Sequence, residues 1–232
     1  MNNINYSLSS HIALHEKKRS LYRYICGLLA GIMCIIIISS NMSITVSADD
    51  YPKAPDIESG NCILMDADSG IVLYEKNSGE KCYPASVTKL MTALIVAESC
   101  NLGDTLTVSR NAVSSVKYGD AAAGLKTGEE FTVEQALNVM LIKSANDMAY
   151  ALGEYAGGSI ANFANMMNKK AEELGCLNTH FTNASGLTDL NHYTTAYDMA
   201  LICRAVLGYP AIMNAISYTK SYSVPPTNKT AD

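Results

Sequence analysis

The feature that most constrains this chain is a serine followed three residues later by a lysine, at the start of a long apolar helical pattern. Ser86 and Lys89 lie three apart, so on a helix they occupy neighbouring ridges. Pro84 prevents the helix from extending backward, which places Ser86 near the helix N-terminus, where N–H groups are free. The apolar residues recur at helical spacing: Val87, Leu90, Met91, Leu94 and Ile95. The pattern therefore predicts a helix with one apolar face and a hydroxyl–amine pair in its first turn.

This pair suits nucleophilic catalysis. A serine hydroxyl is a weak nucleophile until a neighbouring base takes its proton. The Lys89 amine can be that base only when it is neutral, and bringing a lysine pKa from about 10.4 to near 7 costs about 4–5 kcal/mol. Burial and a helix N-terminus both favour the neutral form. We therefore predict Ser86 as the nucleophile and Lys89 as its base.

The spacing alone is weak evidence, because the sequence contains it four times. The four pairs are Ser78/Lys81, Ser86/Lys89, Ser114/Lys117 and Ser217/Lys220. The Ser86 pair is the one that opens a long amphipathic run, whereas Ser78 lies in a turn-like stretch with Asn77 and Gly79. The prediction therefore depends on the rest of the chain.

A second polar motif interrupts an apolar helical stretch at residues 132–155. Ser144-Ala145-Asn146 places a hydroxyl and an amide where unpaired polar groups are costly. The hydroxyl could relay a proton to a leaving amine, and the amide could hold a substrate carbonyl. The alternative is a simple helix break or cap.

The N-terminus has the pattern of a secretory signal. Basic residues at positions 17–23 precede an apolar run at 24–38, and Val46-Ser47-Ala48 resembles a cleavage site. The sequence thus predicts a signal peptide at 1–48, a linker at 49–60, a domain at 61–232 and an extracytoplasmic location. The alternative is a membrane anchor, although the apolar run has 15 residues and a spanning helix needs about 20.

Charge and cysteine content exclude several classes of function. Without residues 1–48 the chain has 13 Lys and Arg against 21 Asp and Glu, a net charge of −8, which argues against nucleic acid as a partner. Five widely spaced cysteines remain, and we expect most of them to be buried small hydrophobic residues. Their spacing does not suggest zinc. We predict neither a metal site nor a cofactor.

The remaining elements indicate a strand-poor, helix-rich domain. Residues 62–67 and 71–75 flank a turn at 68–70 and predict a β-hairpin. Further helices are expected at 132–155, broken at 143–147, and at 160–174, 194–207 and 210–216. A strand could start at 221–224. Because two or three strands do not form a stable sheet alone, we expect that a partner chain completes the sheet or that the chain stops early.

Taken together, these residues resemble the penicillin-binding, serine-acylating peptidases, and within them the low-molecular-mass D-alanyl-D-alanine carboxypeptidases of serine peptidase family S11. The resemblance covers about residues 60–225. Besides the segments around Ser86 and Ser144, which lie 58 residues apart, it rests on two signatures. These are His180-Phe181-Thr182-Asn183-Ala184-Ser185-Gly186-Leu187 and His192-Tyr193-Thr194-Thr195-Ala196-Tyr197-Asp198-Met199-Ala200.

The resemblance implies an α/β (α+β) penicillin-binding fold, with an antiparallel sheet packed against helices and a helical subdomain. It also implies that Ser86 attacks the peptide bond of a peptidoglycan stem ending in D-Ala-D-Ala and that Lys89 is the base. Ser144 would shuttle the proton, Asn146 would orient the substrate amide, and the Ser86 N–H would form half of an oxyanion hole. β-Lactams would acylate the same serine.

The family's third motif, a Lys-Thr-Gly strand after Ser-x-Asn, has no equivalent in this order. Lys126-Thr127-Gly128 precedes Ser144 and resembles a turn of the family, and Lys229-Thr230-Ala231 lacks the glycine. We therefore expect the chain to be truncated before that strand, to lack the C-terminal sheet strands, to fold poorly and to be inactive or nearly so. The missing strand would carry the other oxyanion donor, typically worth about 10²–10³ in rate.

Three other interpretations stay open. A β-lactamase of the same fold is the first, although the Glu134–Asn138 stretch that resembles its water-positioning motif comes before Ser-x-Asn instead of after it. We expect Glu134 on the surface and Leu137 in the core. A non-catalytic module that recognises penicillin or stem peptide is the second. An unrelated secreted helical protein, with accidental motifs, is the third.

Overall fold

The computed structural model describes residues 23–29, 32, 54–217 and 222–229, and the chain divides into two units, Met1–Pro55 and Asp56–Asp232. In the first unit, residues 23–29 are helical and exposed. The predicted cleavage site after Ala48 lies outside the described residues. None of the described helices is long and apolar enough to cross a membrane by itself. Helices α7 (Ala196–Val206) and α8 (Pro210–Ile216) meet that test only as a pair, bent by 110°.

The second unit contains two small antiparallel sheets. Strands β1 (Cys62–Met65) and β2 (Val72–Lys76) pair, which confirms the predicted hairpin, and β1 packs against α7. Strands β3 (Thr105–Thr107) and β4 (Glu130–Thr132) form a second pair that the sequence did not predict, because three residues are too few for a visible alternation. Both sheets depend on helices for support, as expected for two-stranded pairs.

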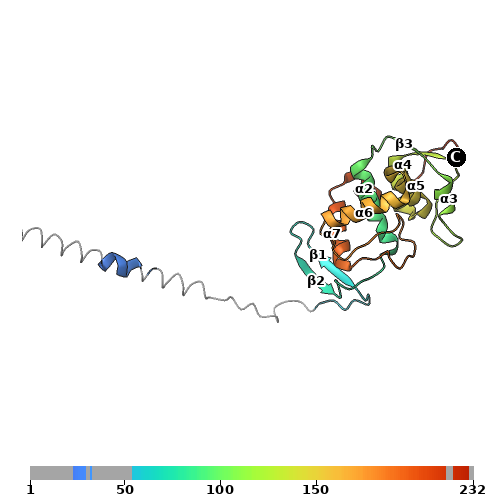
Figure 1. Ribbon diagram of the computed structural model, residues 1–232. Coiled ribbons are helices and arrows are strands. Elements are labelled where there is room, and N and C mark those ends of the chain that lie inside the picture. The colour runs from blue at the N-terminus through green and yellow to red at the C-terminus, as the bar shows by residue number, and fades with distance from the viewer. Residues whose placement is uncertain (1–22, 30–31, 33–53, 218–221, 230–232) are drawn as a thin grey trace, which may run out of the picture. The chain divides into compact units, whose positions relative to one another are not determined.

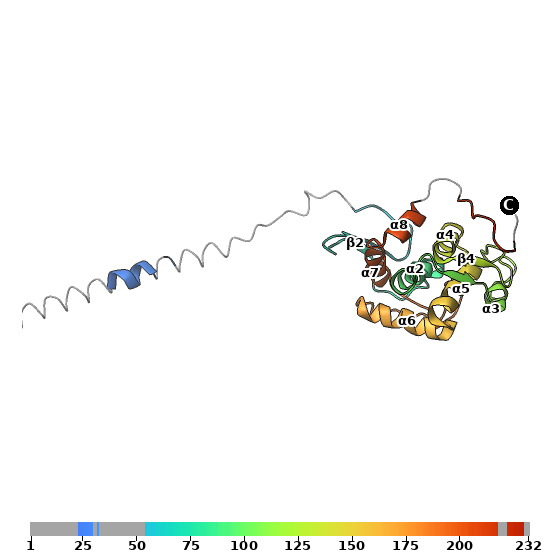
Figure 2. The same ribbon diagram turned by 90° about the horizontal axis from the view of Figure 1, so that it is seen from above.

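One helix lies at the centre of this unit. After the 3₁₀ turn η2 (Ala85–Val87), helix α2 (Thr88–Ser99) contacts α7, α8, α4 (Val133–Lys143), α5 (Asn146–Gly157) and α6 (Ile160–Glu173). Figures 1 and 2 show these helices around α2. The prediction of a single apolar face was therefore too narrow. The buried residues of α2 lie on nearly all its sides: Thr88, Lys89, Met91, Thr92, Ala93, Leu94, Ile95 and Val96.

The predicted break in the long helical stretch is confirmed. Helix α4 starts with a capping box, in which the Thr132 hydroxyl accepts from the Gln135 N–H and the Gln135 side chain accepts from the Thr132 N–H. It ends at Ser144, whose φ of +56° is left-handed, and α5 begins two residues later. The short helix α3 (Arg110–Ser114) packs against α5.

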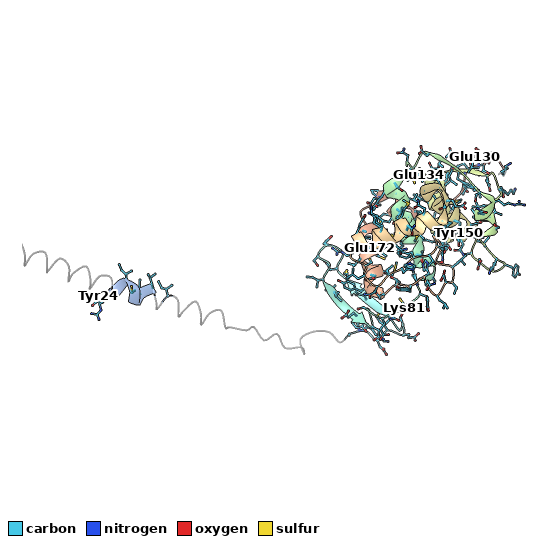
Figure 3. All side chains as sticks on the ribbon, viewed as in Figure 1. Tyr24, Lys81, Glu130, Glu134, Tyr150 and Glu172 are labelled. Carbon is cyan, nitrogen blue, oxygen red and sulfur yellow. The ribbon has the colours of Figure 1, made fainter. Side chains whose placement is uncertain are left out.

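Two predictions about the periphery were wrong. Residues 222–229 contain no strand; they instead pack beside β4, where the Asn228 side chain accepts from the Glu130 N–H at 3.0 Å. Figure 3 labels Glu130 and Glu134 at this edge of the unit. The described cysteines are also less buried than expected, because Cys176 alone among them is fully buried.

Candidate active site

The Lys89 amine is the centre of a cluster of oxygen atoms. Its Nζ lies 3.1 Å from the Ser86 hydroxyl, 2.7 Å from the Asn146 amide oxygen and 3.0 Å from the Ser185 carbonyl oxygen. These partners come from η2, from the start of α5 and from the loop before α7. The structure thus joins three segments that are far apart in the sequence.

Burial disfavours the charged form of this amine. Lys89 is only 3% exposed, and within the described residues no carboxylate lies at ion-pair distance from it. Burial lowers its pKa from 10.5 to about 8. About one molecule in ten therefore carries a neutral amine at pH 7.

The three neighbours determine what a neutral amine can do. An amide oxygen and a carbonyl oxygen accept hydrogen bonds but cannot donate them. A neutral lysine has two N–H bonds and one lone pair. When Asn146 and Ser185 take the two N–H bonds, the lone pair is left for Ser86, whose O–H can then donate to Nζ. This arrangement is the one that proton abstraction from the Ser86 hydroxyl requires.

Ser86 itself is on the surface. Residue 86 is exposed on η2, two residues before α2 begins, so it precedes the helix instead of lying in its first turn as predicted, and Pro84 is buried. Ala85 has a φ of +47°, a left-handed conformation that is costly for an L-residue with a Cβ. Among the described residues, the non-glycine positions with positive φ are Asn77, Ala85 and Ser144. Two of the three therefore lie in the two motifs, as is common at functional sites.

The loop of residues 183–187 holds Ser185 against Lys89. The Thr92 hydroxyl, one turn further along α2, donates to the Ala184 carbonyl at 2.7 Å. Gly186 has a φ of +83°, and a Cβ there would lie 1.7 Å from the Ala85 carbonyl oxygen. The loop thus contacts both η2 and α2. Sequence analysis missed Ser185, because a main-chain carbonyl gives no residue-type signal; the only trace was the turn-forming Asn183 and Gly186.

The two polar residues of the second motif differ in their contacts. Asn146 is buried and bonded to Lys89, as described above. Ser144 lies half-buried at the junction of α4 and α5, and its hydroxyl makes no hydrogen bond to any described residue. The structure thus joins Ser86, Lys89 and Asn146 directly, and leaves Ser144 beside them in the chain with its hydroxyl unengaged.

Asp147 fixes the loop next to this motif. Its buried carboxylate accepts from the N–H groups of Ala123, Gly124 and Leu125 at 2.9–3.2 Å. The Asn146 N–H donates to the Ala121 carbonyl at 2.9 Å. The loop before β4 is therefore attached to the residue that contacts Lys89.

A buried histidine supports the first turn of α2. His192 is 2% exposed, and its Nδ1 accepts from the Thr182 N–H at 3.1 Å. Its Nε2 must then carry the proton, so it donates to the Thr88 hydroxyl at 2.9 Å. Burial lowers the pKa of His192 from 6.5 to about 4, so the ring is neutral at physiological pH. Within the described residues the His192 ring makes hydrogen bonds to Thr88 and Thr182 and none to Lys89 or Ser86.

The two misleading motifs lie elsewhere, as predicted. Thr127 and Gly128 form a turn before β4. Glu134 is exposed and Leu137 is buried on α4. Among the described residues, no group of three or more His, Cys, Asp or Glu side chains could hold a metal ion.

Comparison with known protein families shows which family and which relatives this sequence matches. Residues 48–231 match the Peptidase S11 family model, D-alanyl-D-alanine carboxypeptidase. The chain is 36% identical over 214 residues to the D-alanyl-D-alanine carboxypeptidase DacF of Bacillus subtilis, covering 89% of this chain and 53% of that protein. It is 34% identical over 189 residues to DacC of Escherichia coli, covering 78% and 46%. The chain thus spans about half the length of the curated relatives it matches.

Solved structures share the fold. Penicillin-binding protein 6B of Escherichia coli superposes with a TM-score of 0.70 at 31% identity, covering 76% of this chain and 58% of that one. A mutant of the Streptomyces K15 DD-transpeptidase gives 0.70 at 28% identity, covering 75% and 70%. The predicted α+β penicillin-binding fold is therefore confirmed.

Proposed function

Because the chain belongs to the Peptidase S11 family of D-alanyl-D-alanine carboxypeptidases, we propose that it is a serine-type carboxypeptidase that acts through an acyl-enzyme on Ser86. The observation that carries this proposal is the buried Lys89 amine, whose Nζ lies within hydrogen-bond distance of the Ser86 hydroxyl, the Asn146 oxygen and the Ser185 carbonyl. In its neutral form the amine can donate to Asn146 and Ser185 and direct its lone pair to Ser86. The proposed substrate is a peptidoglycan stem peptide that ends in D-Ala-D-Ala, and β-lactams are the proposed inhibitors.

The first step forms the acyl-enzyme. The Lys89 lone pair takes the proton of the Ser86 hydroxyl while Oγ bonds to the carbonyl carbon of the penultimate D-Ala, and the carbonyl π electrons move to oxygen. The Ser86 N–H, on the 3₁₀ turn that precedes α2, is the proposed donor to that oxyanion. The tetrahedral adduct then collapses, and the C–N bond to the terminal D-Ala breaks.

Two polar groups complete the step. The Ser144 hydroxyl, which has no other partner among the described residues, is proposed to pass the proton from Lys89 to the departing amine. Because the Asn146 oxygen is occupied by Lys89, its NH₂ group remains to donate to the substrate carbonyl. Water then attacks the ester carbon and gives a proton to Lys89. The bond between that carbon and Ser86 Oγ breaks, Oγ takes the proton from Lys89, and the shortened stem peptide leaves with a free carboxyl group.

A fluorescent penicillin tests this proposal. The sequence led us to expect a chain that is inactive or nearly so, but the contacts of Ser86 and Lys89 lead us to expect the opposite. The full chain should form a covalent adduct that is lost in Ser86→Ala and retained in Ser99→Ala, a matched change at the opposite end of α2. A D-Ala-D-Ala stem-peptide analogue should release D-alanine with the same dependence on Ser86. An adduct that persists in Ser86→Ala, or an intact chain that forms none, would refute the proposal. Rapid turnover of the penicillin without release of D-alanine would instead support the β-lactamase interpretation.

We also propose that the chain is exported, so that it meets its substrate outside the membrane. The support is the basic stretch at 17–23, the apolar run at 24–38 and the small residues before position 49. Fusing residues 1–60 to a reporter that is active only after export tests this. A reporter that stays inside the cell would refute it.

A further inference from the structure

We propose that Asn183 is a positioning residue for Lys89: its side chain shapes the loop whose Ser185 carbonyl takes one N–H bond of the amine. This inference rests on the proposed function, since it concerns how the base of that reaction is oriented. Asn183 makes no hydrogen bond to Lys89 or Ser86 in the described part of the chain, and it acts through the main chain.

The hydrogen bonds of Asn183 define the path of the loop. Its amide oxygen accepts from the Ser185 N–H at 3.1 Å, from the Ser185 hydroxyl at 3.2 Å and from the Gly186 N–H at 2.8 Å. Its NH₂ group donates to the Leu187 carbonyl at 3.0 Å. The side chain is only 7% exposed, so water is poorly placed to replace these partners.

This path fixes the direction of the Ser185 carbonyl. The Gly186 N–H shares a peptide plane with the Ser185 carbonyl and is bonded to the Asn183 oxygen at 2.8 Å. The carbonyl on the opposite side of that plane therefore points to Lys89, 3.0 Å away. Thr92 holds the Ala184 carbonyl in the preceding peptide unit. Without Asn183 the Ser185 peptide is free to turn, and Lys89 then has one fixed acceptor instead of two. Its lone pair is no longer directed to Ser86.

The same change admits water to the amine. Water can accept the N–H bond in place of the carbonyl, but it also solvates the ammonium form. The pKa of Lys89 should then rise from about 8 towards its ordinary value of 10.5. Both effects slow acylation. The loss of lone-pair direction acts at every pH, and the higher pKa of Lys89 acts below the new midpoint.

Other titratable side chains near this site do not explain such a change. His192 is bonded to Thr88 and Thr182, and burial keeps its pKa near 4. The carboxylate of Asp147 accepts from its own loop, and that of Asp198, on α7, accepts from the Asn178 N–H at 2.8 Å. None of these three groups faces the Lys89 Nζ in the described hydrogen bonds.

The test is the pH dependence of Ser86 acylation by a fluorescent penicillin, from pH 6 to 10, in the full chain. For Asn183→Ala we expect the high-pH plateau to fall by about tenfold or more and the midpoint to move above that of wild type. Asn183→Ser, whose hydroxyl accepts the same N–H bonds more weakly, should recover part of both. If Asn183→Ala does not fold, the same measurement on Asn183→Ser tests the inference.

Asn168→Ala is the matched control. Asn168 also holds this region through two main-chain bonds, to the Phe181 N–H and carbonyl, but it lies on α6 and does not reach Ser185. It should lower the thermal midpoint and leave the pH midpoint of acylation unchanged. If wild type acylates and the Asn183 variants keep its pH midpoint and plateau, the inference fails while the proposed function stands. If wild type does not acylate, both fail.

Discussion

Replacing Gly186 with alanine would push the loop of residues 183–187 away from η2, the turn that carries Ser86. The Cα of Gly186 lies so close to Ala85 that a Cβ would meet its carbonyl oxygen at 1.7 Å and the Thr88 hydroxyl at 2.8 Å. Real Cβ atoms do not approach closer than 3.0 Å, so one segment must move by at least 1.3 Å. The segment that moves is either the loop carrying the Ser185 carbonyl or the turn carrying Ser86.

The chain provides a control that separates this clash from backbone strain. Gly175 follows α6 with a φ of +80°, almost the +83° of Gly186, but a Cβ at Gly175 would meet nothing within 4 Å. Alanine at either position incurs the left-handed penalty of about 1–2 kcal/mol. Gly186→Ala should add an overpacking cost of about 1–3 kcal/mol. Because a shift of about 1 Å can cost 10²-fold in rate, we expect acylation to fall by about that factor.

Two measurements check the expectation. Urea unfolding should show Gly186→Ala less stable than Gly175→Ala, and labelling with a fluorescent penicillin at a temperature where both are folded should show a slower Gly186→Ala. Equal stability and labelling rates within about threefold of each other would refute the idea that this close approach positions the nucleophile.

Three further predictions follow from the same geometry. Acylation of wild type should rise with pH to a plateau with a midpoint near 8, the pKa of Lys89; a rate that is flat from pH 6 to 10 contradicts Lys89 as the base. His192 has a folded pKa of about 4 and an unfolded value of 6.5, so the unfolded state binds more protons between these values and stability falls as pH drops through them. Between pH 7 and 4.5 the free energy of unfolding of wild type, measured with urea, should fall by about 2–3 kcal/mol, whereas that of His192→Gln should not show this fall. Equal losses in the two proteins would exclude the histidine as the cause. Asp147→Ala should speed hydrogen exchange at residues 123–125 and leave residues 91–96 protected, whereas unchanged exchange would show that the carboxylate does not hold the loop.

The strong local patterns predicted much of the fold. The hairpin around residues 68–70, the helix that begins just after Ser86 and the break at 143–147 are all visible in residue spacing and turn chemistry. The burial of α2 on nearly all its sides was not visible, because the spacing of apolar residues does not reveal that five other helices surround it. The β3–β4 pair was missed because its contacts are non-local and its strands are short.

The candidate site was predicted in part. Side-chain chemistry singled out Ser86, Lys89 and Asn146, which the structure brings together. The role of Ser144 stays a prediction, since its hydroxyl contacts none of them in a described hydrogen bond. The Ser185 carbonyl could not be predicted, because it is a main-chain atom 96 residues away from Lys89.

That carbonyl has a consequence for how such a site evolves. Every amino acid carries a main-chain oxygen, so a substitution at residue 185 does not remove this contact, and the contact places no selection on the side chain at that position. Selection acts instead on the neighbours that give the loop its course. A search of related sequences for invariant side chains would therefore overlook one of the atoms closest to the reactive amine.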